Sequence, residues 1–221
     1  NMRQLMLTVI VFLTTTISGQ TKQELTKFVP KGFVISEKIT GDLNKDGLID
    51  CVLIIKGTDK KKIVKDENSE EVDRNRMGII ILLNKNNHFE LTTKNYNCFS
   101  SANEDGGVYL APELDIEIIK GILCINYGHG RYGFCRYTFR LQDSDFELIG
   151  YDSSDNSGPV VNRETSINFL SKKKNIKENT NQNASKEGEE VFKVTWAKVQ
   201  LDKLIKLSEI IDFDKLDFDN D

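Results

Sequence analysis

The chain has 221 residues, with 30 lysines and arginines against 34 aspartates and glutamates, and its formal net charge is −4. A mildly acidic chain of mixed charge is unsuited to non-specific nucleic-acid binding, which needs a basic surface. About 200 residues remain after the N-terminal segment considered next, which is enough for one domain of ordinary size or two small ones.

The first 19 residues have the pattern of a secretory signal peptide. Arg3 gives a basic start, an apolar run covers residues 5–13, and small or polar residues lead to Gly19. The apolar run is too short for a stable membrane span, which needs about 20 residues. We therefore predict cleavage near Gln20, a periplasmic or secreted location, and no membrane span after signal removal. The alternative is that the segment is retained as an anchor.

The first half of the mature chain alternates short apolar runs with turn signals. A short helix is expected at residues 23–29, because Pro30 and Gly32 follow as stop signals. Four strands are expected, at residues 33–39, 51–55, 77–83 and 88–93. Between the second and third of them, residues 57–76 are charged and have hardly any apolar anchors, so we expect an exposed loop.

The second half continues with the same alternation. Five further strands are expected, at residues 116–119, 122–126, 134–141, 146–151 and 165–171. A tight hairpin is expected at Lys120 and Gly121, and residues 175–189 are polar enough for an exposed loop. Residues 191–199 fit either a helix or a strand, with Trp196 in the core. The acidic C-terminal segment fits a short helix or an ordered tail.

These elements predict a mainly β fold. Roughly seven to nine strands joined by hairpin-length connections are typical of an antiparallel sandwich or a strongly curved sheet, here with short terminal helices. We expect a single β-rich domain over residues 20–221. A propeller or solenoid is not expected, because the sequence holds one copy of its most distinctive loop and those folds need several repeats.

That loop, from Asp42 to Asp50, is the most informative motif of the chain. Four oxygen-bearing side chains occur at alternate positions and then after a gap of four, with Gly47 where the backbone must turn sharply. Calcium takes about six to eight oxygen ligands, and a tight loop can supply them from alternate side chains and a carbonyl. The sequence therefore predicts a calcium site, and the alternative is an Asx-rich turn that binds no metal.

The loop and the strand after it resemble the calcium loop of FG-GAP and VCBS-type repeats, over roughly residues 41–91. In such repeats a second strand ends in a pattern like Leu83-Asn84, with an aromatic such as Phe89 soon after. The remainder of the chain looks like an uncharacterised group of secreted bacterial proteins that carry one such loop apiece. The resemblance implies calcium ligands from the side chains of Asp42, Asn44, Asp46 and Asp50, and from the backbone carbonyl of Leu48.

A second candidate site is the glycine- and aromatic-rich segment of residues 127–133. His129 stands between two glycines, and a histidine can act as a general base near neutral pH. Arg131, with Tyr127 and Tyr132 beside it, suits recognition of a carboxylate or a sugar face. The alternative is a tight turn with exposed aromatic packing.

A third candidate is the pair of adjacent acids Glu104 and Asp105, which precede two glycines. These carboxylates can form a second metal site. If the loops meet, they can instead pair with His129 or Arg131 and form the acid and base of a hydrolase. The alternative is a solvated loop.

Four cysteines, Cys51, Cys98, Cys124 and Cys135, follow the signal segment. An even number in an oxidising compartment allows two disulfides in three connectivities. Cys124 and Cys135 could face each other across a hairpin. The alternative is that all four are buried thiols packed as small apolar residues.

The sequence contains no complete catalytic motif, such as a nucleophile-elbow serine, a zinc-protease helix or a phosphate-binding glycine loop. We therefore expect a non-enzymatic, exported, calcium-binding β-rich protein, used as a binding or envelope-associated module with an unknown protein or glycan partner. The alternative function is a secreted hydrolase, whose site would consist of Glu104, Asp105, His129 and Arg131.

Overall fold

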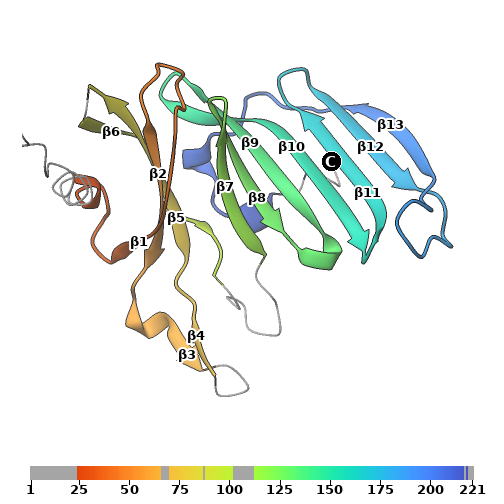
Figure 1. Ribbon diagram of the computed structural model, residues 1–221, viewed down its shortest axis with the longest axis horizontal. Helices are drawn as coiled ribbons and strands as arrows, with labels where there is room; N and C mark the ends of the chain where they lie inside the picture. Colours follow the sequence, from red (N-terminus) through yellow and green to blue (C-terminus); the bar gives the residue numbers. More distant parts are fainter. Residues whose placement is uncertain (1–23, 66–69, 87, 102–111, 217, 219–221) are drawn as a thin grey trace, which may run out of the picture.

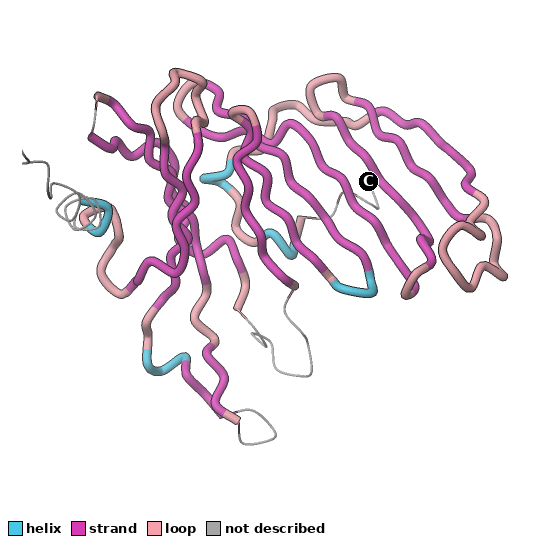
Figure 2. The backbone as a smooth tube through the Cα atoms, in the orientation of Figure 1, coloured by secondary structure: helices cyan, strands magenta, loops and turns pink. Residues whose placement is uncertain are grey.

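The computed structural model describes residues 24–65, 70–86, 88–101, 112–216 and 218. Within them the chain forms a four-stranded sheet, a seven-stranded sheet and a small two-stranded hairpin, with antiparallel pairing throughout (Figures 1 and 2). The predicted mainly β, antiparallel fold is therefore confirmed. The predicted signal peptide, residues 1–19, and the acids Glu104 and Asp105 lie outside the described residues.

The four-stranded sheet has the strand order β1-β2-β5-β6. Its members are β1 (Phe33–Gly41), β2 (Asp50–Gly57), β5 (Met77–Lys85) and β6 (His88–Phe99). The two central strands are almost continuous runs of β-branched and apolar residues, which suits strands covered on both faces. Val52 and Ile54 of β2 enter the main core, while Leu53 and Ile55 enter a second cluster on the opposite face.

Residues 57–76, expected as an exposed loop, contain a short hairpin that projects from this sheet (Figure 1). A 3-10 turn, η1 (Lys60–Lys62), leads into β3 (Ile63–Lys65), which pairs with β4 (Glu71–Asp73). The expectation of exposure holds for most of the β3 side chains, but the expectation of irregular backbone is wrong. Pairing of two three-residue strands satisfies backbone groups without needing apolar anchors, so the hydrophobic pattern does not reveal it.

The seven-stranded sheet is a meander whose strands lie in chain order. It consists of β7 (Glu113–Ile119), β8 (Ile122–Gly128), β9 (Gly133–Gln142), β10 (Asp145–Ser157), β11 (Val160–Asn168), β12 (Lys173–Asn179) and β13 (Phe192–Lys198). The expected hairpin at Lys120 and Gly121 is confirmed, and both residues have positive φ, as a two-residue hairpin turn requires. The predicted loop at residues 175–189 is partly wrong, because its first five residues belong to β12.

One core joins the two sheets. Residues such as Ile81 of β5 and Phe139 of β9 belong to the same buried cluster. The C-terminal segment crosses the inner face of the larger sheet as an ordered tail with two 3-10 turns, η3 (Leu207–Glu209) and η4 (Phe213–Lys215). The Phe213 ring is buried and its centroid lies 5.2 Å from that of Phe99. The tail therefore closes the sandwich by packing an aromatic side chain between β6 and the larger sheet.

The predicted core position of Trp196 is wrong. This residue lies on β13, the edge strand of the larger sheet, and its side chain is 68 % exposed. Every residue of β13 is exposed, because the part of the chain that the structure describes covers neither of its faces. Size and hydrophobicity make a tryptophan a good core candidate, but burial depends on whether another layer lies over that strand.

Candidate functional site

The predicted calcium loop connects β1 to β2 at one end of the four-stranded sheet (Figure 1). Two of its residues, Lys45 and Gly47, have positive φ angles of 62° and 86°. Glycine adopts this left-handed conformation freely. Because two residues with positive φ are separated by one with negative φ, the backbone folds into a compact bend. The loop is therefore held by its own backbone conformation between two paired strands.

Side chains of the loop turn inward onto its backbone. Asp42 accepts hydrogen bonds from the amides of Asp46, at 3.2 Å, and Gly47, at 3.0 Å. The side-chain oxygen of Asn44 accepts from the same Asp46 amide at 3.0 Å, and Asp46 accepts from Leu48 N at 2.8 Å. Asp42, Asn44 and Asp46 thus gather their oxygens around one short stretch of backbone. The hydrogen bonds from Leu48 N and the Asn44 amide lower the pKa of Asp46 and favour its ionised form.

Asp50 fixes the loop to the sheet. It is fully buried, and its two oxygens accept hydrogen bonds from Leu43 N at 2.7 Å and Asn84 N at 2.9 Å. The Asn84 side chain also donates to the carbonyl of Ile49 at 3.2 Å. Burial raises the pKa of Asp50, and the backbone hydrogen bonds oppose this rise. The Leu83-Asn84 pair singled out in the sequence therefore serves to tie β5 to the end of the loop.

The opposite side of the loop faces the β7–β8 turn. A Cβ placed on Gly121 would collide with the side chain of Lys45, so this lysine lies directly across the turn. A surface hollow between the two is lined by Asp42, Lys45, Ile118, Lys120 and Gly121. The loop is thus supported by both sheets.

Within the described residues, no group of three or more His, Cys, Asp or Glu side chains lies close enough together to hold a metal ion. Of the predicted side-chain ligands, Asp42, Asn44 and Asp46 place oxygens over the bend. The fourth, Asp50, is buried, and both of its oxygens accept backbone hydrogen bonds instead. The loop therefore offers two carboxylates and the Asn44 amide oxygen, besides backbone carbonyls such as that of Leu48. Calcium sites commonly combine carboxylates with amide, carbonyl and water oxygens, so this donor set fits calcium better than a transition metal.

The second predicted site lies in the connection between β8 and β9. His129 N donates to Gly133 O at 2.9 Å, and Gly158 N donates to Arg131 O at 3.1 Å. Gly133 has a φ of 111°, and a Cβ there would collide with Ser154 O. A glycine is therefore required at this position for the connection, which includes η2 (Gly130–Tyr132), to pack against β10.

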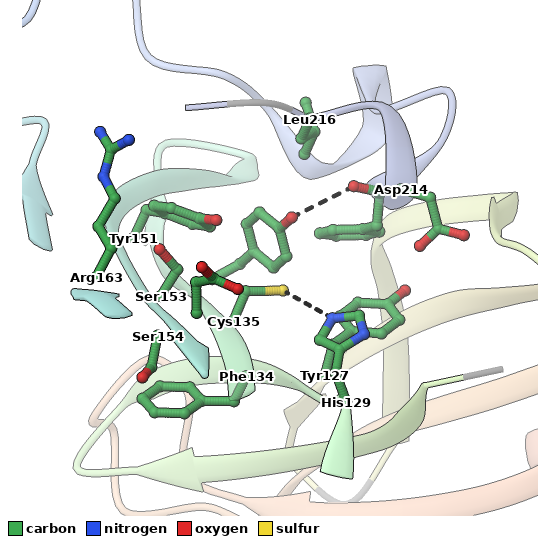
Figure 3. Close-up of a pocket in the computed structure, with 13 residues that line it drawn as sticks. Tyr127, His129, Phe134, Cys135, Tyr151, Ser153, Ser154, Arg163, Asp214 and Leu216 are labelled. Carbon is green, nitrogen blue, oxygen red and sulfur yellow. Dashed lines mark hydrogen bonds between the residues drawn. The ribbon is translucent and has the colours of Figure 1, made fainter. Parts of the chain in front are cut away.

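His129 and Arg131 separate in the folded chain. The Arg131 guanidinium lies over the exposed Tyr132 ring, 5.5 Å from its centroid, which fits the predicted alternative of exposed aromatic packing. His129 instead faces Cys135, with its Nε2 atom 4.0 Å from Sγ (Figure 3). Arg131 is not among the residues that line the pocket beside His129.

That pocket has a volume of about 270 Å³ and opens between the larger sheet and the C-terminal tail. Its walls combine aromatic rings with titratable groups from four strands and η4 (Figure 3). The titratable and thiol groups that line it are His129, Cys135, Asp155, Arg163 and Asp214, together with three tyrosines. Of this set, the sequence indicated only His129 and Tyr127 as candidate site residues, and Cys135 only as a disulfide partner. The other groups come from positions that only the sheet pairing brings together.

All four cysteines lie in the described part of the chain, and each is a thiol outside any disulfide. Cys124 lies opposite Thr138, and Cys135 lies opposite Tyr127, so the two cysteines do not pair across the β8–β9 hairpin. Alternation along the strands also places them on opposite faces of the sheet. Burial raises the pKa of Cys51 to about 11 and raises the pKa values of Cys98 and Cys124 as well.

The chain has no significant match among protein family models, curated proteins or solved structures. Among the described residues, no helix is long and apolar enough to cross a membrane.

Proposed function

We propose that the protein is a non-enzymatic, exported, calcium-binding β-rich module. The observation that carries this proposal is the inward arrangement of Asp42, Asn44 and Asp46 around the bend that joins β1 to β2. Burial is the largest cause of the raised pKa of Asp50, and the negative charge of Asp46 adds to it, so these two carboxylates repel each other when no cation is bound. A bound calcium ion replaces this repulsion with attraction and stabilises the connection to the buried strand β2.

We propose that the protein is exported because residues 1–19 have the pattern of a secretory signal peptide. Extracellular calcium modules bind with dissociation constants on the order of 0.1–1 mM, because their surroundings are rich in calcium. A ligand that binds only the folded chain stabilises it by mass action. With a dissociation constant of about 0.5 mM, about 10 mM calcium adds about 2 kcal/mol to the free energy of unfolding.

Thermal unfolding of the mature chain in calcium and in a chelator tests the proposal. We expect calcium to raise the Tm by several degrees, and we expect Asp46→Ala to abolish this rise. Asp202→Ala is the matched control, because it removes the charge of an exposed aspartate outside the loop. An unchanged Tm of the wild type in calcium would contradict the proposal, as would a full calcium response in Asp46→Ala.

We also propose that the module binds a second copy of itself through β13. This strand lies at the edge of the seven-stranded sheet and presents Phe192, Val194 and Trp196 on one face, with exposed fractions of 38, 52 and 68 %. An exposed edge strand with an apolar face is a template for pairing with another strand. Such pairing extends the sheet and brings the apolar faces of the two β13 strands side by side.

The sequence of β13 is complementary to itself in one register. If Thr195 pairs with Thr195 of the second copy in an antiparallel arrangement, Trp196 lies opposite Val194, and Lys193 lies opposite Ala197. The second lysine of the strand then lies opposite a phenylalanine, so that no lysine faces another lysine. This register joins large apolar side chains on one face and avoids like-charge repulsion.

Light scattering coupled to size-exclusion chromatography tests the self-association. We expect the wild type to elute as a dimer, and the double variant Val194→Lys with Trp196→Lys to elute as a folded monomer. Ile211→Lys is the matched control, because Ile211 is 84 % exposed on the C-terminal tail, away from β13. A monomeric wild type, or a dimeric double variant, would show that β13 is not the interface.

A further inference from the structure

The pocket in Figure 3 brings together a thiol and an imidazole that the calcium module does not use. The β8–β9 connection places the imidazole, and strand β9 places the thiol. Its closing hydrogen bond from His129 N to Gly133 O, and the close packing of Gly133 on β10, fix the position of the histidine. As a result, Nε2 of His129 lies 4.0 Å from Sγ of Cys135, at the outer limit for a hydrogen bond that involves sulfur.

Cys135 differs from the other three cysteines in its access to solvent. Cys51 and Cys98 are fully buried and Cys124 is 5 % exposed, whereas Cys135 is half-buried and opens into the pocket. A thiol beside an imidazole and open to small molecules has the surroundings of a reactive cysteine. The fully buried thiols are in apolar surroundings that disfavour the thiolate.

The pocket also contains a polar group that points to a ligand. Tyr127 is 5 % exposed and lines the pocket, and its hydroxyl has no hydrogen-bond partner among the described residues. A buried hydroxyl without a partner is costly, and a bound molecule with a donor or acceptor would satisfy it. The remaining walls include the rings of Tyr137, Tyr151 and Phe213, which suit the apolar part of such a molecule.

Charged groups of both signs surround the thiol. Arg163 of β11 and His129 stand on opposite sides of Cys135 in Figure 3. Asp155 of β10 lies opposite Arg163 in the strand register, and Asp214 of η4 lines the same pocket. Ser100 donates a hydrogen bond to Asp214. A ligand that carries both an ammonium and a carboxylate group matches these walls better than a ligand of a single sign.

We propose that Cys135 is a nucleophilic thiol that forms a mixed disulfide with a small zwitterionic disulfide bound in this pocket, with His129 as the proton acceptor. The Nε2 atom of His129 takes the thiol proton, and the Cys135 sulfur attacks one sulfur of the ligand. The ligand S–S bond breaks, its electron pair leaves on the second sulfur, and the proton passes from His129 to this thiolate. The products are the mixed disulfide and one small thiol, so the ligand itself is the oxidant.

Oxidised glutathione, which carries ammonium and carboxylate groups, is the probe for this reaction. The full chain is incubated with it in a chelator, so that the result does not depend on the calcium proposal. Mass spectrometry with peptide mapping is expected to find one adduct per chain, on Cys135. We expect His129→Gln to slow the reaction by about tenfold or more at neutral pH, because the thiolate fraction falls.

Two controls separate a proton acceptor from a merely structural histidine. His88→Gln changes the chain's other histidine, which lies in an exposed pair with Glu90, and is expected to react at the wild-type rate. When the pH is lowered from about 8 to about 6, the rate of adduct formation on Cys135 should fall by a smaller factor in the wild type than in His129→Gln. The groups that face the thiol during this titration are His129, Asp155, Arg163, Asp214 and the tyrosines of the pocket.

Ligand charge gives a second test. The wild type should react faster with oxidised glutathione than with cystamine, a disulfide that carries only positive charges. Arg163→Gln should reduce this preference, and Arg163→Lys should restore part of it. The proposal is overturned if Cys135 stays unmodified in the folded chain, if His129→Gln reacts at the wild-type rate, or if cystamine and oxidised glutathione react equally fast. Modification that begins only in urea would also overturn it.

Discussion

The two sheets of this protein differ most at their strands β2 and β13. All residues of β2 from Asp50 to Ile55 are buried, because the main core covers one face and a second cluster with Leu25 covers the other. All residues of β13 are exposed. A loop attached to β2 is therefore anchored in a fully buried part of the molecule, whereas β13 is available for contacts with other molecules.

The largest effect that we expect concerns this difference directly. Leu53→Ala in β2 should lower the free energy of unfolding by about 2–5 kcal/mol, because it removes fully buried methyl groups and leaves a cavity. In the monomer, Val194→Ala in β13 should change it by less than about 0.5 kcal/mol. Urea unfolding of both variants is the measurement, at a protein concentration low enough to keep the chain monomeric. Similar losses in both would mean that another part of the same chain covers β13.

A comparison of two glycines in the larger sheet should give the next largest effect. Gly133→Ala is expected to cost about 2–4 kcal/mol, because φ is 111° and the new methyl group would collide with Ser154 O. Gly158→Ala should cost only about 1 kcal/mol, because its φ of 64° is unfavourable but its surroundings are open. Thermal unfolding measures both. Equal costs would mean that the β8–β9 connection is not clamped against β10.

The smallest effect concerns the hairpin that projects from the four-stranded sheet. Lys56 Nζ lies 2.8 Å from Asp73 Oδ2, and this contact holds the pKa of Asp73 at about 2. A folded-state pKa below the ordinary 3.8 means that stability is present above about pH 4 and is lost as the pH falls towards 2. Both side chains are more than one-third exposed, so solvent screening keeps the effect below about 1 kcal/mol.

Unfolding in urea across this pH range measures the contribution of Asp73. Lys56→Met should remove the part of the pH dependence that Asp73 provides. An identical pH profile in the wild type and in Lys56→Met would contradict the assigned role of this ion pair.

Much of the fold follows from local patterns in the sequence. Alternating apolar residues and the Lys120-Gly121 turn indicate strands and hairpins because strand faces and turn conformations depend on neighbouring residues. The exposure of Trp196 could not be predicted in this way. It depends on which layers cover β13, and that is decided by how the two sheets and the C-terminal tail pack.

The two candidate sites differ in the same way, since one depends on neighbouring residues and the other on tertiary packing. The inward turn of Asp42, Asn44 and Asp46 is a local property of nine residues, so the sequence alone identified the loop. The pocket of Cys135 depends on distant contributions, such as Arg163 of β11 and Asp214 of the tail. His129 stood out by its glycine neighbours, but its contact with Cys135 requires the β8–β9 pairing.

Calorimetric titration of the mature chain with calcium tests the central claim most directly. We predict one saturable site per chain, with a dissociation constant on the order of 0.1–1 mM, that disappears in Asp46→Ala and persists in Asp202→Ala. No saturable binding by the wild type, or unchanged binding by Asp46→Ala, would contradict the assignment of the Asp42–Asp50 loop as a calcium site.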